Sequence, residues 1–378
     1  MTSNGTNLNI VHVSDLHIGK AAIDPTHIHN NLKRYLYSKL NSNTDLLFIT
    51  GDVWDTLLYL NSKAARVGLA IIGELNELAL RYDFLLRVVD GTFRHDRKQN
   101  TAFTAGSDTE NTKVYDCIAI EHIPKYDIDV LYLPDDLPYE NTVLTAIREI
   151  VTSTLIDKTW VNIIAGHGYF EHVLPVGIPH VPNNTYTHRE LSKFVNGPIL
   201  FGHDHRRSQF KNVSYAGSFE RLEHGAEDRK GFNCLTYNTT THKTEVEFIE
   251  NEQSVIFKTI DLTAHEDEED IDDAVQKYIA WLDNVITGNN SEHKIYIRVA
   301  TNNISLAQGL TGYTRTKPNV HITTKRPDKS KKANPNALIF EPSVLPVITP
   351  QNLDISVQKY LSEKGLILPV ETITKILK

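Results

Sequence analysis

The stretch ILFGHDHRRS, residues 199–208, places two histidines directly after a short apolar run. The apolar run predicts a buried strand. His203 and His205 are two positions apart, so their side chains are expected to face the same side of the chain. Gly202 leaves room for a close approach to a bound ion. The pattern is typical of a metal site at the end of a strand.

Three more motifs share this design, in which a polar side chain follows an apolar run. They are HVSDLHIG at 12–19 with Asp15 and His17, ITGDVWD at 49–55 with Asp52, and IIAGHGYFEH at 163–172 with His167. Each motif alone is also what a turn with a structural carboxylate or histidine looks like. Together they indicate one centre at the carboxyl ends of strands, where α/β sheets bind ligands. Asp52 is a candidate bridge between two ions because its carboxylate has two oxygens to share.

The regions between these motifs predict an α/β fold. Short apolar runs that read as strands alternate with two stretches of helical spacing. Two later runs look antiparallel and suggest a second sheet. The strands are expected at 8–13, 45–50, 84–89, 161–165 and 198–201, the helices at 26–40 and 63–82, and the later runs at 209–215 and 232–237.

The pattern changes near residue 251. A strand at 255–262, a helix that follows the acidic run 265–273, and a strand at 294–300 predict a small β-α-β domain over 251–345, behind a first domain over 1–250. The basic segment KRPDKSKK, 325–332, either contacts phosphate or is a plain loop. The tail at 346–378 has two short helical patterns with an apolar face, which packs on its own domain or on the helices of another protein.

Composition limits the function classes. The net charge of −8 is unusual for a protein that coats nucleic acid, so any contact with DNA is expected to be local, metal-assisted or shared with a partner. No apolar run is long enough to span a membrane and the N-terminus lacks the features of a secretion signal, so we expect a cytoplasmic protein with no membrane role. Cys117 and Cys234 form no disulfide framework and are expected in the core or in strands.

Imidazole and carboxylate ligands together suit a divalent transition ion such as Mn²⁺ or Fe²⁺, with Zn²⁺ also possible, whereas oxygen ligands alone favour Mg²⁺ or Ca²⁺. Two such ions about 4 Å apart can clamp phosphoryl oxygens and activate a water. The expected reaction is therefore hydrolysis of a phosphate ester.

The motifs resemble those of the calcineurin-like metallophosphoesterases, which run D-x-H, GD-x-x-D, GNHD, a lone H and GH-x-H. In addition, YAGSFERLEHGAEDRKGF at 215–232 is similar to the segment that follows the last histidines in SbcD-like DNA-repair nucleases, especially the shorter phage recombination endonuclease subunits. The resemblance covers the first 250 residues, and the remainder only by position and pattern. It implies a two-sheet sandwich flanked by helices, a β-α-β capping domain and a helical C-terminal segment. It also implies one ion held by Asp15, His17, Asp52 and His205, and a second held by Asp52, His167 and His203.

By this resemblance we expect a Mn²⁺-dependent exonuclease, with possible endonuclease activity, that acts on double-stranded DNA ends in recombination, repair or degradation. The expected partners are an SMC-family, SbcC-like ATPase, bound in part through 346–378, and a second copy in a homodimer. The expected setting is the cytoplasm of a bacterium or of a phage-infected cell. Two alternatives remain: a phosphatase or small-molecule phosphodiesterase with the same metals, and a catalytically weakened DNA-binding scaffold.

The third motif departs from the family, because VVDGTFRHDRKQN at 88–100 lacks the Asn of GNHD. Thr92, a water or Asn100 could take its place. The resemblance makes His95 the candidate general acid, and histidine has a pKa near working pH. The alternative is a loop histidine held by Asp96. In the catalytic reading Asp96 orients the His95 ring.

Other residues near the motifs have secondary or structural expectations. Arg206 and Arg207 either bind phosphate or are simply exposed. Asp55 is expected to support the ligands rather than to be one, and Arg221 and Lys230 to brace the wall of the site. The histidines without a matching motif are read as structural: His12, His172, His188 and His224.

Overall fold

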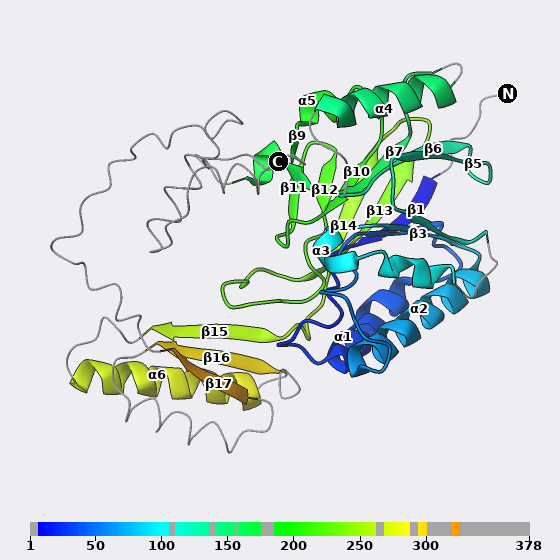
Figure 1. The fold of residues 1–378 in the computed structure, drawn as a ribbon. Coiled ribbons are helices and arrows are strands. Elements are labelled where there is room, and N and C mark those ends of the chain that lie inside the picture. Colours follow the sequence, from blue (N-terminus) through cyan, green and yellow to red (C-terminus); the bar gives the residue numbers. More distant parts are fainter. Residues whose placement is uncertain are drawn as a thin grey trace, which may run out of the picture. The chain divides into compact units, whose positions relative to one another are not determined.

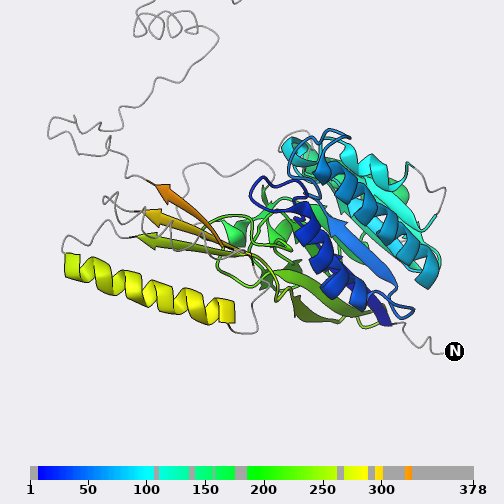
Figure 2. The same cartoon turned by 90° about the horizontal axis from the view of Figure 1, so that it is seen from below.

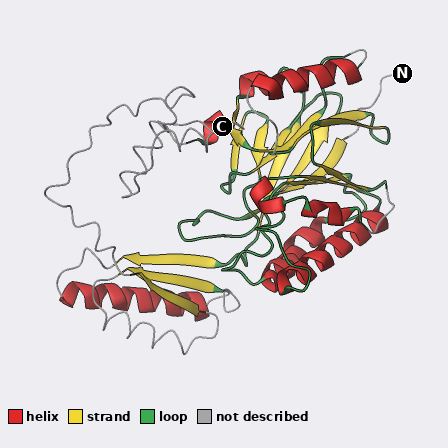
Figure 3. Cartoon of the chain, in the orientation of Figure 1, coloured by secondary structure: helices red, strands yellow, loops and turns green. Residues whose placement is uncertain are grey.

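The computed structural model describes residues 7–105, 110–135, 141–155, 158–174, 185–261, 268–287, 294–300 and 320–325. Two six-stranded mixed sheets, flanked by helices, form the main body of these residues (Figure 1 and Figure 3). The expected α/β class is therefore confirmed.

The first sheet contains the strand that precedes Asp15 and the strand that precedes Asp52. Strands β1 to β4 of this sheet run parallel, and β13 returns antiparallel beside β1. The carboxyl ends of the parallel strands therefore open at one edge. The order is β14 (Thr244–Glu250), β13 (Gly231–Asn238), β1 (Asn7–Val13), β2 (Leu46–Thr50), β3 (Leu85–Val89) and β4 (Thr112–Tyr115).

The second sheet contains the strands before His167 and before His203. Its central strands β12, β10, β7 and β6 are parallel, with antiparallel β11 and β5 at the edges. The order is β11 (Ser208–Phe210), β12 (Val213–Tyr215), β10 (Ile199–Gly202), β7 (Ile163–His167), β6 (Ile128–Leu133) and β5 (Ala119–Ile123).

The run 209–215 joins this second sheet, but the run 232–237 does not. It forms β13, which pairs with β1 in the first sheet. The expectation that both runs belong to a second sheet was wrong for the later one. An alternating pattern identifies a strand with one buried face, and it carries no information about which strand lies beside it.

The two sheets pack face to face over one apolar cluster. Phe48 from β2 and Tyr132 from β6 lie in it with Ala165 and Leu200 from the second sheet. A second cluster covers the outer face of the first sheet beneath helices α1 and α2, and a third covers the outer face of the second sheet beneath α4. Figure 2 shows α1 and α2 running side by side on the first sheet.

Local sequence explains where the helices begin. Asp24 accepts a hydrogen bond from the Thr26 N–H ahead of α1, and Ser62 accepts one from the Ala65 N–H ahead of α2. The expected first helix is correctly placed but becomes a π turn and a 3-10 turn after Asn31. The helices are α1 (Pro25–Asn31), α2 (Lys63–Tyr82), α3 (Phe93–Asp96), α4 (Asn141–Thr154), α5 (His188–Leu191) and α6 (Glu268–Thr287), and a two-stranded pair is formed by β8 (Tyr169–Phe170) and β9 (Thr185–Tyr186).

The β-α-β pattern after residue 251 forms a separate three-stranded parallel sheet. Strands β15 (Ile256–Asp261), β16 (Ile295–Ala300) and β17 (Val320–Lys325) pair in that order and share an apolar cluster with α6. The last of these strands was not predicted. The division of the chain at residue 250 stays a prediction. Most of the basic segment 325–332 and the whole tail 346–378 lie outside the described residues.

The structure also bears on the expectations for the two cysteines and for a membrane span. Cys117 lies in an exposed bend between β4 and β5, so its expected place in the core or in a strand was wrong, whereas Cys234 lies in β13 and is half-buried. Within the part of the chain that the structure describes, no helix combines the length and apolar character needed to cross a membrane.

Candidate metal centre

The loops that follow β1 and β2 run side by side. The Asp15 N–H donates to the Gly51 carbonyl at 3.1 Å, and the His17 N–H donates to the Asp52 carbonyl at 3.0 Å. The loop after β10 joins them, because the His203 N–H donates to the Asp15 carboxylate at 3.1 Å. These backbone contacts place the ends of strands from both sheets around one centre.

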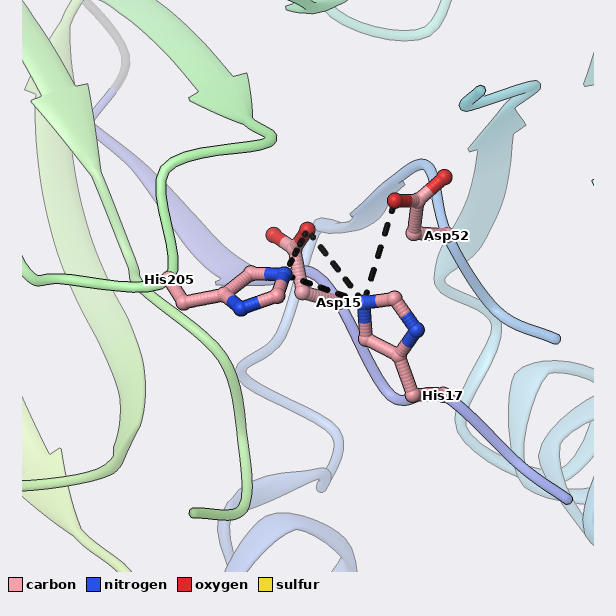
Figure 4. A group of neighbouring side chains, drawn as sticks. All are labelled: Asp15, His17, Asp52 and His205. Atoms are coloured by element: carbon pink, nitrogen blue, oxygen red, sulfur yellow. Dashed lines mark hydrogen bonds and ion pairs between the residues drawn. The ribbon is translucent and has the colours of Figure 1, made fainter. Parts of the chain in front are cut away.

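The first group consists of Asp15, His17, Asp52 and His205, each of which offers one ligand atom within 4.8 Å of the others (Figure 4). The Nε2 atoms of His17 and His205 lie 3.1 Å apart. His17 Nε2 also lies 3.7 Å from Asp52 Oδ2, and His205 Nε2 lies 3.6 Å from Asp15 Oδ1. All but His205 are buried.

The second group consists of Asp52, His167 and His203, within the same spacing. His203 Nδ1 lies 3.1 Å from His167 Nε2, and His167 Nε2 lies 3.5 Å from Asp52 Oδ1. Asp52 therefore presents Oδ2 to the first group and Oδ1 to the second. The six candidate ligands named from sequence come together in two groups with the membership that the resemblance implied.

The Nδ1 atoms of two candidate ligands, His167 and His17, have hydrogen-bond partners on the side away from the centre. His167 Nδ1 lies 2.8 Å from the Thr50 carbonyl oxygen, which only accepts, so Nδ1 carries the proton and the Nε2 lone pair faces the centre. His17 Nδ1 lies 3.1 Å from Asp55 Oδ1, which fixes the same tautomer. The supporting role expected for Asp55 agrees with this contact.

The donor set fits divalent transition ions. Buried carboxylates and imidazole lone pairs converge at distances that suit a shared cation. The site mixes nitrogen and oxygen donors, as manganese, iron and zinc sites do. These side chains can therefore hold a metal ion.

The backbone at the site is held in an unusual conformation. Four of the six candidate ligands have positive φ: Asp15 at 52°, His17 at 44°, Asp52 at 50° and His203 at 99°. Such angles are uncommon for residues with a side chain and cluster at functional sites. The fold holds these four residues where their side chains meet, at a cost in local strain.

Two glycines allow the loops to approach so closely. A Cβ atom at Gly51 would lie 2.2 Å from His167 Nδ1, and one at Gly202 would lie 2.0 Å from the Thr50 carbonyl oxygen. Gly51 also has a φ of +82°. Any larger side chain at either position would displace a candidate ligand or the strand behind it.

Charge at the centre favours ionised Asp52. Burial by itself raises its pKa, but the imidazoles of His167, His17 and His95 outweigh burial and hold the pKa of Asp52 below its usual range. Burial would lower the pKa of His167, and nearby carboxylates, Asp52 foremost, raise it well above its usual value. Burial lowers the pKa of His203 and of His205, which favours their neutral, metal-binding form.

The structure excludes one of the three candidates for the place of the missing Asn in the third motif. Asn100 is fully buried, where its side-chain oxygen accepts from Trp54 Nε1 at 3.0 Å and its nitrogen donates to Asp90 at 2.8 Å. Both ends of the Asn100 amide therefore bond to residues other than the candidate ligands. Thr92 lies at the second group instead, with Oγ1 3.4 Å from Asp52 Oδ2 and 3.5 Å from His203 Nδ1.

The expected pairing of His95 with Asp96 was wrong. His95 Nδ1 lies 2.6 Å from the Asp55 carbonyl oxygen. The buried Asp96 carboxylate accepts instead from the backbone N–H groups of Asp52, Trp54 and Gly91. The Asp96 carboxylate thus connects the second motif to the third. Contacts with backbone N–H groups cannot be predicted from the spacing of residues within a motif.

Asp96 is also an unusual buried acid. Burial raises its pKa to about 7, with a further contribution from the charge of Asp52 and against the N–H donors of Gly91 and Trp54. His95 stays close to the first group through Asp55, since His17, Asp55 and His95 offer ligand atoms within 4.8 Å of one another. Its position beside the candidate ligands is compatible with the expected catalytic role.

The cations after the last ligand contact atoms other than the candidate ligand atoms. Arg206 donates to the Asp204 carboxylate at 3.1 Å, and the Arg207 guanidinium lies 4.7 Å from the centre of the Phe248 ring. Lys230 is buried and donates to the His205 carbonyl at 2.7 Å, as expected of a bracing residue. Arg221 donates to the Val255 carbonyl at 3.3 Å. The four histidines read as structural lie outside both groups.

Sequence reasoning missed two residues beside the centre. Asp135 Oδ2 lies 4.0 Å from His203 Nδ1, and the Tyr169 ring centre lies 4.0 Å from that of His203. Asp135 follows the apolar strand β6, so the strand-end signal that found the other carboxylates could have found it too. An open pocket of about 850 Å³ adjoins the site, with Tyr169, His203, His205 and Lys230 in its lining.

Comparison with known proteins identifies no family. No protein-family model matches the chain, and no curated protein matches it. Among solved structures, 45 chains match. One of them superimposes with a TM-score of 0.35 and 13% identity, over 64% of this chain and 99% of its own length. A likeness of that size carries no argument about function.

Proposed function

We propose that this chain is a two-metal phosphodiesterase, the nuclease subunit of a DNA-processing complex, with the fold of a calcineurin-like metallophosphoesterase. The observation that carries the proposal is the position of Asp52, whose two carboxylate oxygens face two separate groups of histidines. A shared carboxylate at the ends of strands from both sheets suits a pair of neighbouring cations better than a single one.

In this proposal Asp15, His17, Asp52 and His205 hold one ion, and Asp52, His167 and His203 hold the other, with manganese as the working metal. When bound, such ions supply positive charge for phosphoryl oxygens and a water nucleophile at neutral pH. The protein contributes rigid positioning. Thr50 and Asp55 fix two ring tautomers, and Lys230 holds the backbone carbonyl of His205.

His95 is proposed as the group that protonates the leaving 3′ oxygen. Its ring centre lies 4.8 Å from that of His17, and the Asp55 carbonyl orients it through Nδ1. A histidine held in this way can deliver a proton to a leaving oxygen without being a ligand of either group. The chemistry then needs no further acid among the described residues.

The charge of the pocket supports dependence on metal and on a partner. The residues that line it include the acids Asp204, Glu223, Glu227 and Asp228, against the cations Arg206 and Lys230. An acidic wall repels a phosphate backbone unless bound cations offset it. We therefore propose that an SbcC-like SMC-family ATPase supplies most of the grip on double-stranded DNA, with this chain acting at the ends, as a homodimer.

The choice of DNA over a small phosphate ester rests on the segment 215–232, which resembles that of SbcD-like nucleases. In the structure this segment runs from the end of β12 into β13 and supplies one wall of the pocket, from Ser218 to Lys230. The capping role of the three-stranded sheet β15-β16-β17 with α6 and the binding of the ATPase by 346–378 are parts of the same proposal.

The test is cleavage by the purified full chain in Mn²⁺. We expect degradation of an end-labelled linear duplex, cleavage of bis-p-nitrophenyl phosphate, and little action on p-nitrophenyl phosphate. His203→Ala is the matched inactive control. Preference for the monoester contradicts the nuclease and supports a phosphatase. Cleavage no greater than that of His203→Ala, with and without the ATPase, supports a non-catalytic scaffold.

A further inference from the structure

The second group of candidate ligands is incomplete by the usual standards of metal sites. It draws on three protein atoms, Asp52 Oδ1, His167 Nε2 and His203 Nδ1, and it shares Asp52 with the first group. Divalent ions of this kind bind about four to six ligands. A further donor beside the group would bring it closer to a full coordination shell.

Asp135 follows β6, the strand that lies beside the strand ending at His167. Strand β6 pairs parallel with β7, and Leu133 is opposite Gly166, so the residues after Leu133 continue alongside His167. The Asp135 N–H donates to the Asp90 carbonyl at 3.3 Å, which anchors the start of this loop to the residue after β3 in the first sheet. The Asp135 side chain is 8% exposed. Both sheets thus fix the backbone position from which this carboxylate extends.

The distance to His203 is compatible with a common ion. Two atoms that each lie about 2.1 Å from one ion are at most about 4.2 Å apart. Asp135 Oδ2 lies 4.0 Å from His203 Nδ1, within that limit but too far for a hydrogen bond. Asp135 is not within 4.8 Å of all three members of the group, so its side chain has to rotate toward the ion when the ion binds. Thr92 Oγ1 is closer, at 3.5 Å, but a neutral hydroxyl is a weaker ligand than a carboxylate.

We propose that the Asp135 carboxylate is a ligand of the second divalent ion, together with Asp52, His167 and His203. This inference rests on the proposed metal centre and deepens it. A second carboxylate makes this group richer in hard oxygen donors and favours Mn²⁺ or Mg²⁺ over softer ions. The competing reading is that Asp135 only pairs with a protonated His203 imidazole.

Equilibrium dialysis of the metal-stripped full chain against Mn²⁺ separates the two readings. The wild type is expected to bind two ions per chain. Asp135→Ala and Asp135→Asn are expected to weaken one of them at least tenfold and to leave the other unchanged. Asp116→Asn is the matched control, because it removes one negative charge from an exposed side chain outside both groups and should bind two ions normally. Thermal unfolding shows which variants are folded. If Asp135→Ala does not fold, the metal binding of Asp135→Asn decides between the two interpretations.

Two ions bound at wild-type affinity by Asp135→Asn overturn the inference and leave the proposed function intact. Loss of one ion from the Asp135 variants, in a wild type that binds two ions but cleaves no DNA, supports the inference and contradicts the nuclease. A wild type that binds fewer than two ions overturns both. An equal loss in Asp116→Asn also overturns the inference, because it would reflect net charge alone.

Discussion

The Nε2 atom of His17 lies 3.1 Å from the Nε2 atom of His205, although the two residues follow strands of different sheets. His17 follows β1 in the first sheet and His205 follows β10 in the second. A cation held between these rings would connect the two layers of the fold. Metal binding should therefore stabilise the whole main body as well as serve catalysis.

We expect Mn²⁺ to raise the unfolding temperature of the metal-stripped wild type. Saturation at 100 times the dissociation constant stabilises a folded protein by about 2.7 kcal/mol for each site. Asp52→Asn should lose most of this shift, because Asp52 faces both groups. Calorimetry with and without Mn²⁺ measures the effect, and a full shift in Asp52→Asn would show that the groups do not share this residue.

Glycine substitutions should separate the site from the rest of the fold. In Gly51→Ala the new Cβ would lie 2.2 Å from His167 Nδ1, at a backbone φ of +82°, so we expect a loss of more than about 2 kcal/mol in the free energy of unfolding and weaker Mn²⁺ binding. Gly73 in α2 is the matched control. A Cβ atom there would meet no described side chain within 4 Å, so Gly73→Ala should stabilise by about 0.5–1 kcal/mol. Urea unfolding measures both variants, and equal effects would contradict the close approach at Gly51.

A buried histidine away from the ligands should make the chain sensitive to acid. His12 is fully buried beside Thr50, and burial lowers its pKa to about 3. Between pH 6.5 and 3 the unfolded chain binds a proton that the folded chain does not, so the free energy of unfolding falls as the pH falls. At pH 5 the loss through this residue is about 2 kcal/mol relative to pH 7.5.

Urea unfolding at pH 5 and pH 7.5 in the presence of a chelator tests this effect. His12→Gln keeps a polar group that can reach Thr50 but does not titrate, so its stability should fall by about 2 kcal/mol less than that of the wild type over the same range. If the two proteins lose the same stability, His12 is not the source of the acid sensitivity.

His95→Gln should affect turnover rather than metal content. If His95 donates the proton to the leaving oxygen, its loss lowers kcat by about 10²–10⁴ while two ions remain bound. His188→Gln is a control of the same chemical change, because His188 contacts Asn212 and lies outside both groups. A normal kcat in His95→Gln would remove His95 from the mechanism, and loss of an ion would make it a ligand.

The meeting of the six candidate ligands could be predicted because each follows an apolar run that forms a strand. Parallel strands bring such positions to one edge, so His167 and His203 were detectable from local pattern alone. The contacts of Asp96 and Asn100 could not be predicted in this way. Their partners, the Asp52 N–H and Trp54 Nε1, lie more than 40 positions away in the chain. Spacing within a motif contains no record of such tertiary contacts.

The same limit applies to the fold. The strand at β13 was predicted, but its neighbour β1 lies at the other end of the first 250 residues, and pairing at that range depends on how the whole sheet closes. Asp135 was missed for a different reason. Asp129 and Tyr132 interrupt the apolar run of its strand, so the local pattern marks this strand less clearly than the strands before the candidate ligands.

The positive φ angles at Asp15, His17, Asp52 and His203 also bear on protein engineering. Each such residue costs the fold roughly 1–2 kcal/mol, which glycine would not. Glycine at any of the four would relieve that strain but would also remove contacts of the side chain, such as that of the Asp15 carboxylate with the His203 N–H. The chain therefore embodies a trade-off between stability and function. Selection for heat resistance could therefore act in two ways, by relieving the strain at these residues or by tighter binding of an ion that connects the two sheets.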